Sequence, residues 1–264
     1  MGYETVIWEQ AGAAGRITLN RPESLNAWSE ELGRELSDVV NVRAAADSVR
    51  AVLITGTGRG FSSGVDLKAG FAPHPEDGRP DAARELHEVY HPIMAGIRRL
   101  EKPVVAAVNG PAVGIGCSLA LACDLVLASE SAAFSLAFVN IGLMPDGGST
   151  LFVPAAVGKA RAFEMAFMGE RVEAARALEW GLINEVLPDD ELMGAAGALL
   201  ERLAKGPTRS YASSKRALNQ MMYPQLDSQL ALEAELQHQL ARSDDFLEGV
   251  GAFLAKRKPS FRGA

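Results

Sequence analysis

Three mainly apolar runs lie in the first half of the chain, at Val49 to Thr55, Val104 to Val108 and Leu125 to Ala128. Short apolar runs of this kind are typical of strands that are buried on both faces, as in parallel sheets. Stretches with helical periodicity lie between them, from Ser29 to Ala46 and from Asp81 to Leu100. The alternation of strands and helices predicts right-handed crossovers and parallel pairing, and therefore an α/β core.

The two ends of the chain follow other patterns. Thr5 to Trp8 and Gly15 to Asn20 are typical of short paired strands, joined by a turn at Gly12 to Ala14. From Thr150 onward the pattern is nearly all helical. We expect an extended segment over residues 134–138 and helices over residues 151–167, 172–179, 191–205, 208–222 and 225–256. We divide the chain into a core of residues 1–200 and a helical C-terminal region of residues 201–264.

Composition and charge exclude several classes of function. The 264 residues include 33 acidic and 26 basic ones, which gives a net charge of −7 and disfavours general binding to nucleic acid. The basic cluster within residues 256–262 is large enough for one polyphosphate ligand. Neither a signal peptide nor an apolar run of bilayer length occurs, so we expect a cytoplasmic protein without membrane contact. Cys117 and Cys123 are interpreted as small core residues.

The stretch from Pro103 to Leu127 combines a buried strand, a glycine-rich turn (Asn109 to Gly116) and a helix of small residues (Cys117 to Cys123). A turn that leads into a helix leaves backbone N–H groups unpaired beside the positive end of the helix dipole. Such a site suits an oxygen atom that carries or develops negative charge. A dinucleotide-binding turn would need glycine where Leu119 stands, and a phosphate-binding P-loop would need lysine after Gly116.

This stretch resembles the second oxyanion loop of the crotonase (enoyl-CoA hydratase/isomerase) superfamily, which has an N-G-x-x-x-G-x-G run before a small-residue helix. GTGRGFSSGVDLK at residues 56–68 resembles the first oxyanion loop, and NIGLMPDGGST at residues 140–150 resembles the catalytic segment. The resemblance implies the crotonase (ClpP-like) fold, a spiral of repeated ββα units with a helical C-terminal region that covers the site and makes trimer contacts. It also implies a homotrimer or a dimer of trimers.

Members of this superfamily hold the carbonyl oxygen of an acyl-CoA thioester between two backbone N–H groups. The resemblance places these donors at Val65 and Ile115. Removal of a proton from the carbon beside a thioester makes an enolate, and two preorganised donors stabilise the charge that grows on its oxygen. Coenzyme A is part of the substrate, and the resemblance implies neither a redox cofactor nor a metal.

The side chains near this site decide which reaction is expected. Hydratases of the superfamily use two glutamates, and Ser118 and Phe138 stand at those positions, so ordinary hydration is not expected. Asp146 falls where several isomerases and the chloroaromatic acyl-CoA dehalogenases of the superfamily carry an aspartate. Its apolar neighbours Phe138, Leu143 and Met144 would raise its pKa and make it a better base near neutral pH. Asp146 could also cap the helix that follows it.

We expect an enoyl-CoA isomerase in which Asp146 carries a proton from C2 to C4 of a 3-enoyl-CoA while the dienolate is held by the two N–H groups. One base is sufficient for this shuttle, in agreement with the two replaced glutamates. Enoyl-CoA hydratase, acyl-CoA hydrolase and dehalogenase are alternatives within the enzyme class. A non-catalytic acyl-CoA binder that retains the oxyanion loops is the alternative outside it.

The resemblance also indicates where the substrate binds. Leu25 and Ala27 would contact the adenine end through their backbone, and Lys68 would contact a CoA phosphate. Lys258 and Phe261 would reach a CoA that is bound to a neighbouring subunit. The thioester, the pantetheine and the acyl group would be lined by Ser63, Val65, Asp66, Leu67, Lys68, Ile115 and Phe138.

Two other segments carry predictions of their own. His87 and His91 fit the zinc-protease pattern H-E-x-x-H and would share one helix face, which makes a zinc hydrolase the alternative from another class. The pattern fixes only three positions, however, and Pro92 directly follows the second histidine, so we expect a helical pair without metal. Ala69 to Asp81 is interpreted as a solvated loop, with a lid over the ligand as the alternative.

Overall fold

The computed structural model describes residues 2–69 and 78–264, so most of the loop at Ala69 to Asp81 lies outside the described residues. Its main sheet follows the order β1-β2-β3-β4-β6-β9. The hairpin of β1 and β2 is antiparallel, and the pairs from β2 to β9 are all parallel, as the pattern of apolar runs predicts. The strands are β1 (Val6–Ala11), β2 (Ala14–Leu19), β3 (Ala51–Gly56), β4 (Val104–Val108), β6 (Leu125–Ser129) and β9 (Glu185–Leu187).

A second, smaller sheet lies beside the first and has the order β5-β7-β8. It consists of β5 (Ala112–Val113), β7 (Ala133–Ser135) and β8 (Val172–Glu173). Strand β5 pairs in parallel with β7, which pairs antiparallel with β8. Strands of two or three residues are too short to show a periodicity of two, and for this reason β5, β8 and β9 were not predicted from the sequence.

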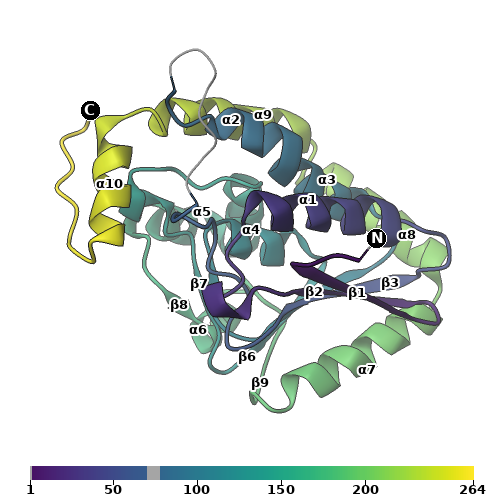
Figure 1. Cartoon of the computed structure of the whole chain (residues 1–264). Coiled ribbons are helices and arrows are strands. Elements are labelled where there is room, and N and C mark those ends of the chain that lie inside the picture. The colour runs from purple at the N-terminus through teal and green to yellow at the C-terminus, as the bar shows by residue number, and fades with distance from the viewer. Residues whose placement is uncertain (1, 70–77) are drawn as a thin grey trace.

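Helices cover both faces of the main sheet (Figure 1). The helices include α1 (Glu30–Asp38), α2 (Ala82–Glu85), α3 (His91–Arg99), α4 (Ile115–Ala122) and α9 (Leu226–Leu240), with π-helical turns η2 (Val39–Arg43) and η3 (Leu86–Tyr90). The remaining helices are α5 (Ser149–Met168), α6 (Ala174–Glu179), α7 (Leu192–Lys205), α8 (Thr208–Met222) and α10 (Asp244–Leu254), with short 3₁₀ turns η1 (Pro22–Ser24) and η4 (Phe138–Ile141). The α/β class with a helical C-terminal region is confirmed.

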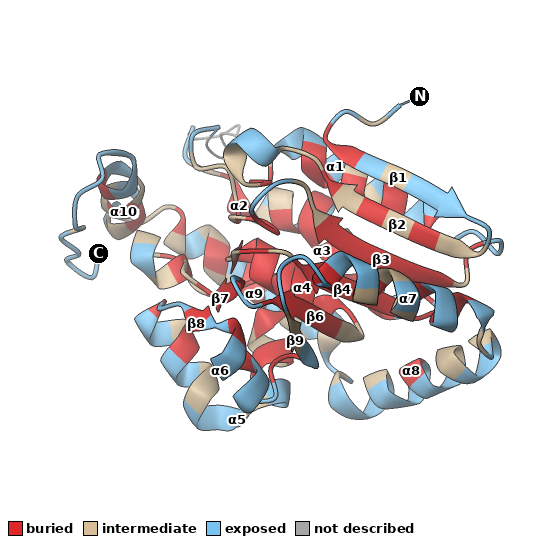
Figure 2. Cartoon of the chain, turned by 90° about the horizontal axis from the view of Figure 1, so that it is seen from below, coloured by how far each residue is buried: buried red, intermediate tan, exposed pale blue. Residues whose placement is uncertain are grey.

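The two faces of the sheet belong to two hydrophobic clusters, because successive side chains of a strand point to opposite faces. In β3, Val52 and Ile54 belong to the larger cluster with α1, α3 and α4, whereas Leu53 belongs to the smaller one. The smaller cluster is closed by α7, through Leu200 and its neighbours. Both faces are therefore buried, and Figure 2 shows β3 as a buried strand.

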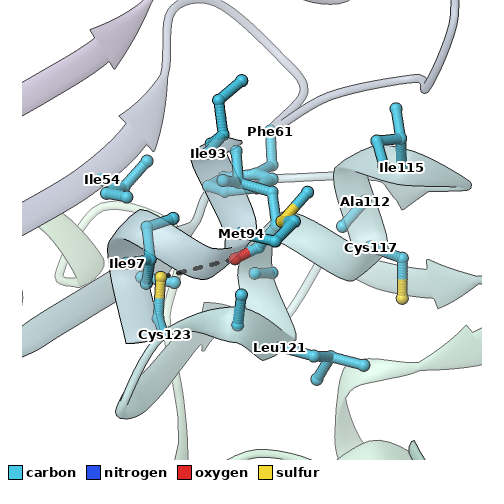
Figure 3. Close-up of a cluster of buried hydrophobic side chains, with 14 of the residues drawn as sticks. Ile54, Phe61, Ile93, Met94, Ile97, Ala112, Ile115, Cys117, Leu121 and Cys123 are labelled. Atoms are coloured by element: carbon cyan, nitrogen blue, oxygen red, sulfur yellow. Dashed lines mark hydrogen bonds between the residues drawn. The ribbon is translucent and has the colours of Figure 1, made fainter. Parts of the chain in front are cut away.

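Helix α4 is buried along its whole length, as its small apolar residues predict. Figure 3 shows Cys117 and Cys123 among the buried side chains of this region, together with Met94 and Ile97 of α3. Both cysteines are free, and burial raises the pKa of each thiol to about 12. They are core residues, as expected.

Several predicted elements differ from the structure. The helix expected over residues 151–167 is interrupted at Gly158, which has a non-helical φ of +73° and ψ of 175°. The helix expected over residues 225–256 is two helices, because Ser243 caps α10 by accepting a hydrogen bond from the Phe246 N–H at 3.1 Å. The helix expected from Val172 begins two residues later, since Val172–Glu173 forms β8. The extended segment expected over residues 134–138 ends at Ser135, because Ala137 adopts a left-handed conformation with φ +48° and the 3₁₀ turn η4 follows.

Candidate active site

A cavity of about 570 Å³ lies where the segments after β3 and β4 meet η4 and α9. Parallel strands end at the same edge of a sheet, so loops that follow neighbouring strands come together there. The packing requires glycine at two contacts: a Cβ on Gly64 would lie 2.9 Å from the carbonyl oxygen of Val113, and one on Gly116 would lie 2.6 Å from Cβ of Ser62. The two glycine-rich loops therefore pack directly against each other.

Most of the residues that were expected at the site line this one cavity. They come from segments that are far apart in the sequence, and comprise Ala27, Ser63, Val65, Asp66, Leu67, Lys68, Ile115, Phe138 and Asp146. Leu25, Lys258 and Phe261 are not among the lining residues. Leu25 has a left-handed backbone with φ +54°, and its carbonyl accepts the Ser63 N–H at 2.9 Å. Lys258 and Phe261 are exposed in the segment after α10, and their predicted contact with a neighbouring subunit stays a prediction.

The backbone N–H groups of Val65 and Ile115 belong to the cavity lining and have no hydrogen-bond acceptor within residues 2–69 and 78–264. The backbone of Trp28 pairs with the residues on either side of Val65: its carbonyl accepts the N–H of Asp66, and its N–H donates to the carbonyl of Gly64. The N–H of Val65 takes no part in this pairing. Ile115 is the first residue of α4, and the N–H groups of a first helical turn have no partner inside the helix. Both groups can donate to an oxygen atom in the cavity.

Asp146 is the buried carboxyl group of the cavity. Its side-chain Oδ2 accepts a hydrogen bond of 2.7 Å from Nε2 of Gln237 on α9, and Oδ1 has no partner in the described structure. Burial raises the pKa of Asp146 to about 8. The charges of Glu233 and Glu85 raise this pKa further, and the hydrogen bond from Gln237 opposes the rise. Such a carboxylate accepts a proton readily near neutral pH.

The alternative role of Asp146, as the cap of the following helix, is wrong. Helix α5 has Gly148 at its N-cap, and the side chain of Asp146 accepts no hydrogen bond from the first turn. That turn is held instead by Glu233 of α9, which accepts the N–H of Gly148 at 2.8 Å and the N–H and hydroxyl of Thr150. Glu233, and not Asp146, therefore supplies the carboxyl group that holds the start of α5.

The two positions that carry glutamates in hydratases have no carboxyl group here. Ser118 is fully buried in α4, and its hydroxyl donates to the main-chain carbonyl of Asp146. Phe138 forms part of the apolar cavity wall beside Leu143 and Ile141. Neither side chain can act as a general acid or base for hydration.

The cavity is also lined by Arg21, Tyr90 and Gln237, which were not predicted from the sequence. Arg21 forms an ion pair with Asp66 at 3.1 Å and donates to the carbonyl of Ala27 at 2.6 Å. Arg21 precedes Leu25 and Ala27 in the same N-terminal loop, which was expected to contact the ligand. This position in the sequence was a signal that Arg21 could also belong to the site. For Gln237 there was none, because it lies 91 residues from Asp146 on a helix without other site residues.

The zinc alternative receives no support from the described residues, in which no group of three or more His, Cys, Asp or Glu side chains could hold a metal ion. The rings of His87 and His91 meet edge to face with centroids 5.6 Å apart. His91 is buried. Burial is the main cause that lowers its pKa to about 4, and the charge of His87 lowers it further.

Within residues 2–69 and 78–264, no helix is long and apolar enough to cross a membrane.

Comparisons with known proteins show the family of this chain. A family model described as enoyl-CoA hydratase/isomerase matches residues 9–264. The chain is 41% identical over 247 residues to a 1,2-epoxyphenylacetyl-CoA isomerase of Escherichia coli, with 94% of each chain covered. It is 43% identical over 263 residues to a probable enoyl-CoA hydratase of Rhodobacter capsulatus, with 100% of each covered. A crystal structure of an enoyl-CoA hydratase from Mycobacterium avium subsp. paratuberculosis superimposes with a TM-score of 0.90 at 39% identity, covering 99% of this chain and 100% of that one.

Proposed function

We propose that this chain, which belongs to the enoyl-CoA hydratase/isomerase family of the crotonase superfamily, moves the double bond of an enoyl-CoA thioester. The two relatives reported above are named for acyl-CoA substrates. The observation that carries the proposal is the carboxyl group of Asp146, which lines the cavity, has one unpartnered oxygen, and stands without a second buried carboxyl among the lining residues.

The proposed reaction is a proton shuttle on a 3-enoyl-CoA. The Asp146 carboxylate takes a proton from C2, and the electrons of that C–H bond delocalise into the thioester to give a dienolate. The N–H groups of Val65 and Ile115 donate to the thioester oxygen, where the negative charge accumulates. The protonated Asp146 then returns the proton to C4, which leaves the double bond between C2 and C3. Atoms and charge balance without a metal or a redox cofactor.

The apolar surroundings of Asp146 favour both halves of this shuttle. Because burial places its pKa at about 8, the proton is neither too weakly nor too strongly held to be returned. Cavity residues on the acyl side, such as Leu86, Phe138 and Leu143, exclude water that would compete for the proton. Lys68 is a cation of the cavity lining, and we place a CoA phosphate beside it.

The test is a parallel assay on 3-hexenoyl-CoA and crotonyl-CoA that follows the absorbance of the conjugated thioester. We expect conjugation to appear with the first substrate, no appreciable loss with the second, and at least a 100-fold slower reaction for Asp146→Asn, since a general base contributes about 10²–10⁴-fold. Fast loss of crotonyl-CoA absorbance would contradict the proposal and make the protein a hydratase. Tight binding of both thioesters without turnover would make it a non-catalytic binder.

An aromatic-derived acyl group is the second candidate substrate, because one relative is named 1,2-epoxyphenylacetyl-CoA isomerase and is 41% identical over nearly the whole chain. The same base and the same two donors would serve that substrate. Assaying 1,2-epoxyphenylacetyl-CoA beside 3-hexenoyl-CoA separates the two candidates through the ratio of their kcat/KM values. Release of free CoA in either assay would instead indicate a thioester hydrolase, and release of chloride from a chlorobenzoyl-CoA a dehalogenase.

We also propose that the chain forms a homotrimer or a dimer of trimers. Exposed apolar side chains on α5 and α8 support self-association: Phe163, Phe167, Met168, Leu218 and Met221. Large exposed apolar side chains that cluster on neighbouring turns mark protein contacts. Mass measurement by analytical ultracentrifugation tests this proposal, and a monomer at micromolar concentration would contradict it.

A further inference from the structure

Helix α9 presents a row of polar side chains to the segment that contains Asp146. Gln229, Glu233 and Gln237 are spaced by four residues, and residues with this spacing lie on one face of a helix. Glu233 holds the N–H groups of Gly148 and Thr150, and Gln229 donates to the Thr150 hydroxyl at 2.9 Å. Gln237 contacts the other end of the same segment.

The amide of Gln237 makes three hydrogen bonds. Its Oε1 accepts the N–H of Met144 at 3.2 Å, and its Nε2 donates to the Met144 carbonyl at 2.8 Å and to Oδ2 of Asp146 at 2.7 Å. The N–H of Met144 can only donate, so Oε1 must face it, and the NH₂ group must therefore face Asp146. Gln237 is buried, with 2% of its surface exposed. The orientation of the amide is thus fixed by its partners.

This orientation distinguishes the two oxygens of Asp146. Oδ2 faces a donor and must accept, whereas Oδ1 has no partner and is shielded from solvent. We propose, on the basis of the function proposed above, that Gln237 is a positioning residue that holds Oδ2 of Asp146 and makes Oδ1 the oxygen that takes and returns the proton. One fixed oxygen can serve both C2 and C4 without rotation of the carboxyl group.

The same contact sets how strongly Asp146 holds its proton. Among the described residues, the ionisable groups that raise the pKa of Asp146 are Glu233 on α9 and Glu85 on α2. Tyr90 of η3 donates a hydrogen bond to the Glu85 carboxylate, and the charge of Asp146 contributes to the raised pKa of Tyr90. Burial and both glutamates favour the protonated form of Asp146, and the Gln237 hydrogen bond favours the charged form. Without Gln237, Asp146 should remain protonated to a higher pH.

Gln237→Met tests this assignment, because it retains the length of the side chain and removes the donor. We expect the acid limb of kcat/KM for 3-hexenoyl-CoA to move upward by about one pH unit or more, and the rate at neutral pH to fall about tenfold or more. Gln237→Glu still offers an acceptor to the Met144 N–H but places a second carboxyl beside Asp146, and we expect a larger upward shift. The matched control is Gln239→Met on the exposed side of α9. It should change neither the activity nor the pH at which kcat/KM falls on the acid side.

Infrared titration provides a readout that does not need turnover. The protonated carboxyl band that is missing in Asp146→Asn should titrate at a higher pH in Gln237→Met than in the wild-type protein. A loss of activity by the same factor at every pH, with an unchanged titration midpoint, would show that Gln237 is merely structural and would overturn the assignment. If the wild-type protein does not isomerise 3-hexenoyl-CoA, the proposed function fails, and the infrared midpoints still decide whether Gln237 controls Asp146.

Discussion

The hydroxyl of Ser118 donates a hydrogen bond to the main-chain carbonyl of Asp146, with 2.7 Å between the two oxygens. This contact joins the helix after the second glycine-rich loop to the segment that carries the candidate base. The same carbonyl also accepts the hydroxyl of Ser149 at 2.8 Å and the backbone N–H of Ser149 at 3.2 Å. The residue that replaces a hydratase glutamate thus helps to hold the backbone of Asp146 in place.

Because two hydroxyls satisfy one carbonyl, we predict that their removal is not additive. Ser118→Ala should lower the free energy of unfolding by about 1 kcal/mol, since Ser149 still bonds the carbonyl. The double variant Ser118→Ala/Ser149→Ala should lose more than the sum of the two single variants, because the buried carbonyl then keeps only the longer hydrogen bond from the backbone N–H of residue 149. Urea unfolding of the four proteins measures this coupling, and strictly additive values would contradict it.

The raised pKa of Asp146 predicts an unusual pH dependence of the activity. The base must be ionised in the free enzyme, so kcat/KM should rise about tenfold per pH unit below pH 8 and level off above it. Burial is the main cause of this pKa. A pH profile on 3-hexenoyl-CoA, with enzyme stability checked at each pH, tests the prediction. A plateau that already begins at pH 5 would mean that Asp146 has an ordinary pKa or is not the base.

The same pKa also predicts the effect of Asp146 on stability. A carboxyl whose pKa is about 8 in the folded state and 3.8 as the reference value takes up a proton on folding between these two pH values. The folded state then binds more protons than the unfolded state, so its stabilising contribution is lost as the pH rises, by about 1.4 kcal/mol per pH unit. Asp146→Asn should therefore become increasingly more stable than the wild-type protein from pH 5 to pH 8. Urea midpoints that stay parallel over this range would contradict the shift.

Ile115→Pro tests one oxyanion donor without breaking the helix. Ile115 is the first residue of α4, a position where proline is tolerated because its N–H has no partner inside the helix. Removal of this donor should lower kcat by about 10²–10³-fold, as for other oxyanion donors. Ile115→Ala is the control, since it loses the side chain but retains the N–H, and its kcat should fall far less. Equal losses in the two variants would assign the effect to packing.

The apolar runs and glycine-rich turns of the sequence determined much of this protein. Continuous apolar runs predicted the parallel strands β3, β4 and β6, because strands buried on both faces need apolar residues throughout. The spacing of three motifs led to the family and to Asp146. These signals are local, and each is contained in a stretch of about 25 residues or fewer.

The tertiary structure alone decided which partners Asp146 has. It showed that Glu233 rather than Asp146 caps α5, that Gln237 holds Oδ2, and that Ser118 holds the backbone. Gln237 and Glu233 lie on α9, where the sequence alone indicates an ordinary solvated helix face. They are buried only because α9 packs against the start of α5. Hydrogen bonds between residues about 90 positions apart depend on how whole elements dock, and local sequence periodicity does not encode that docking.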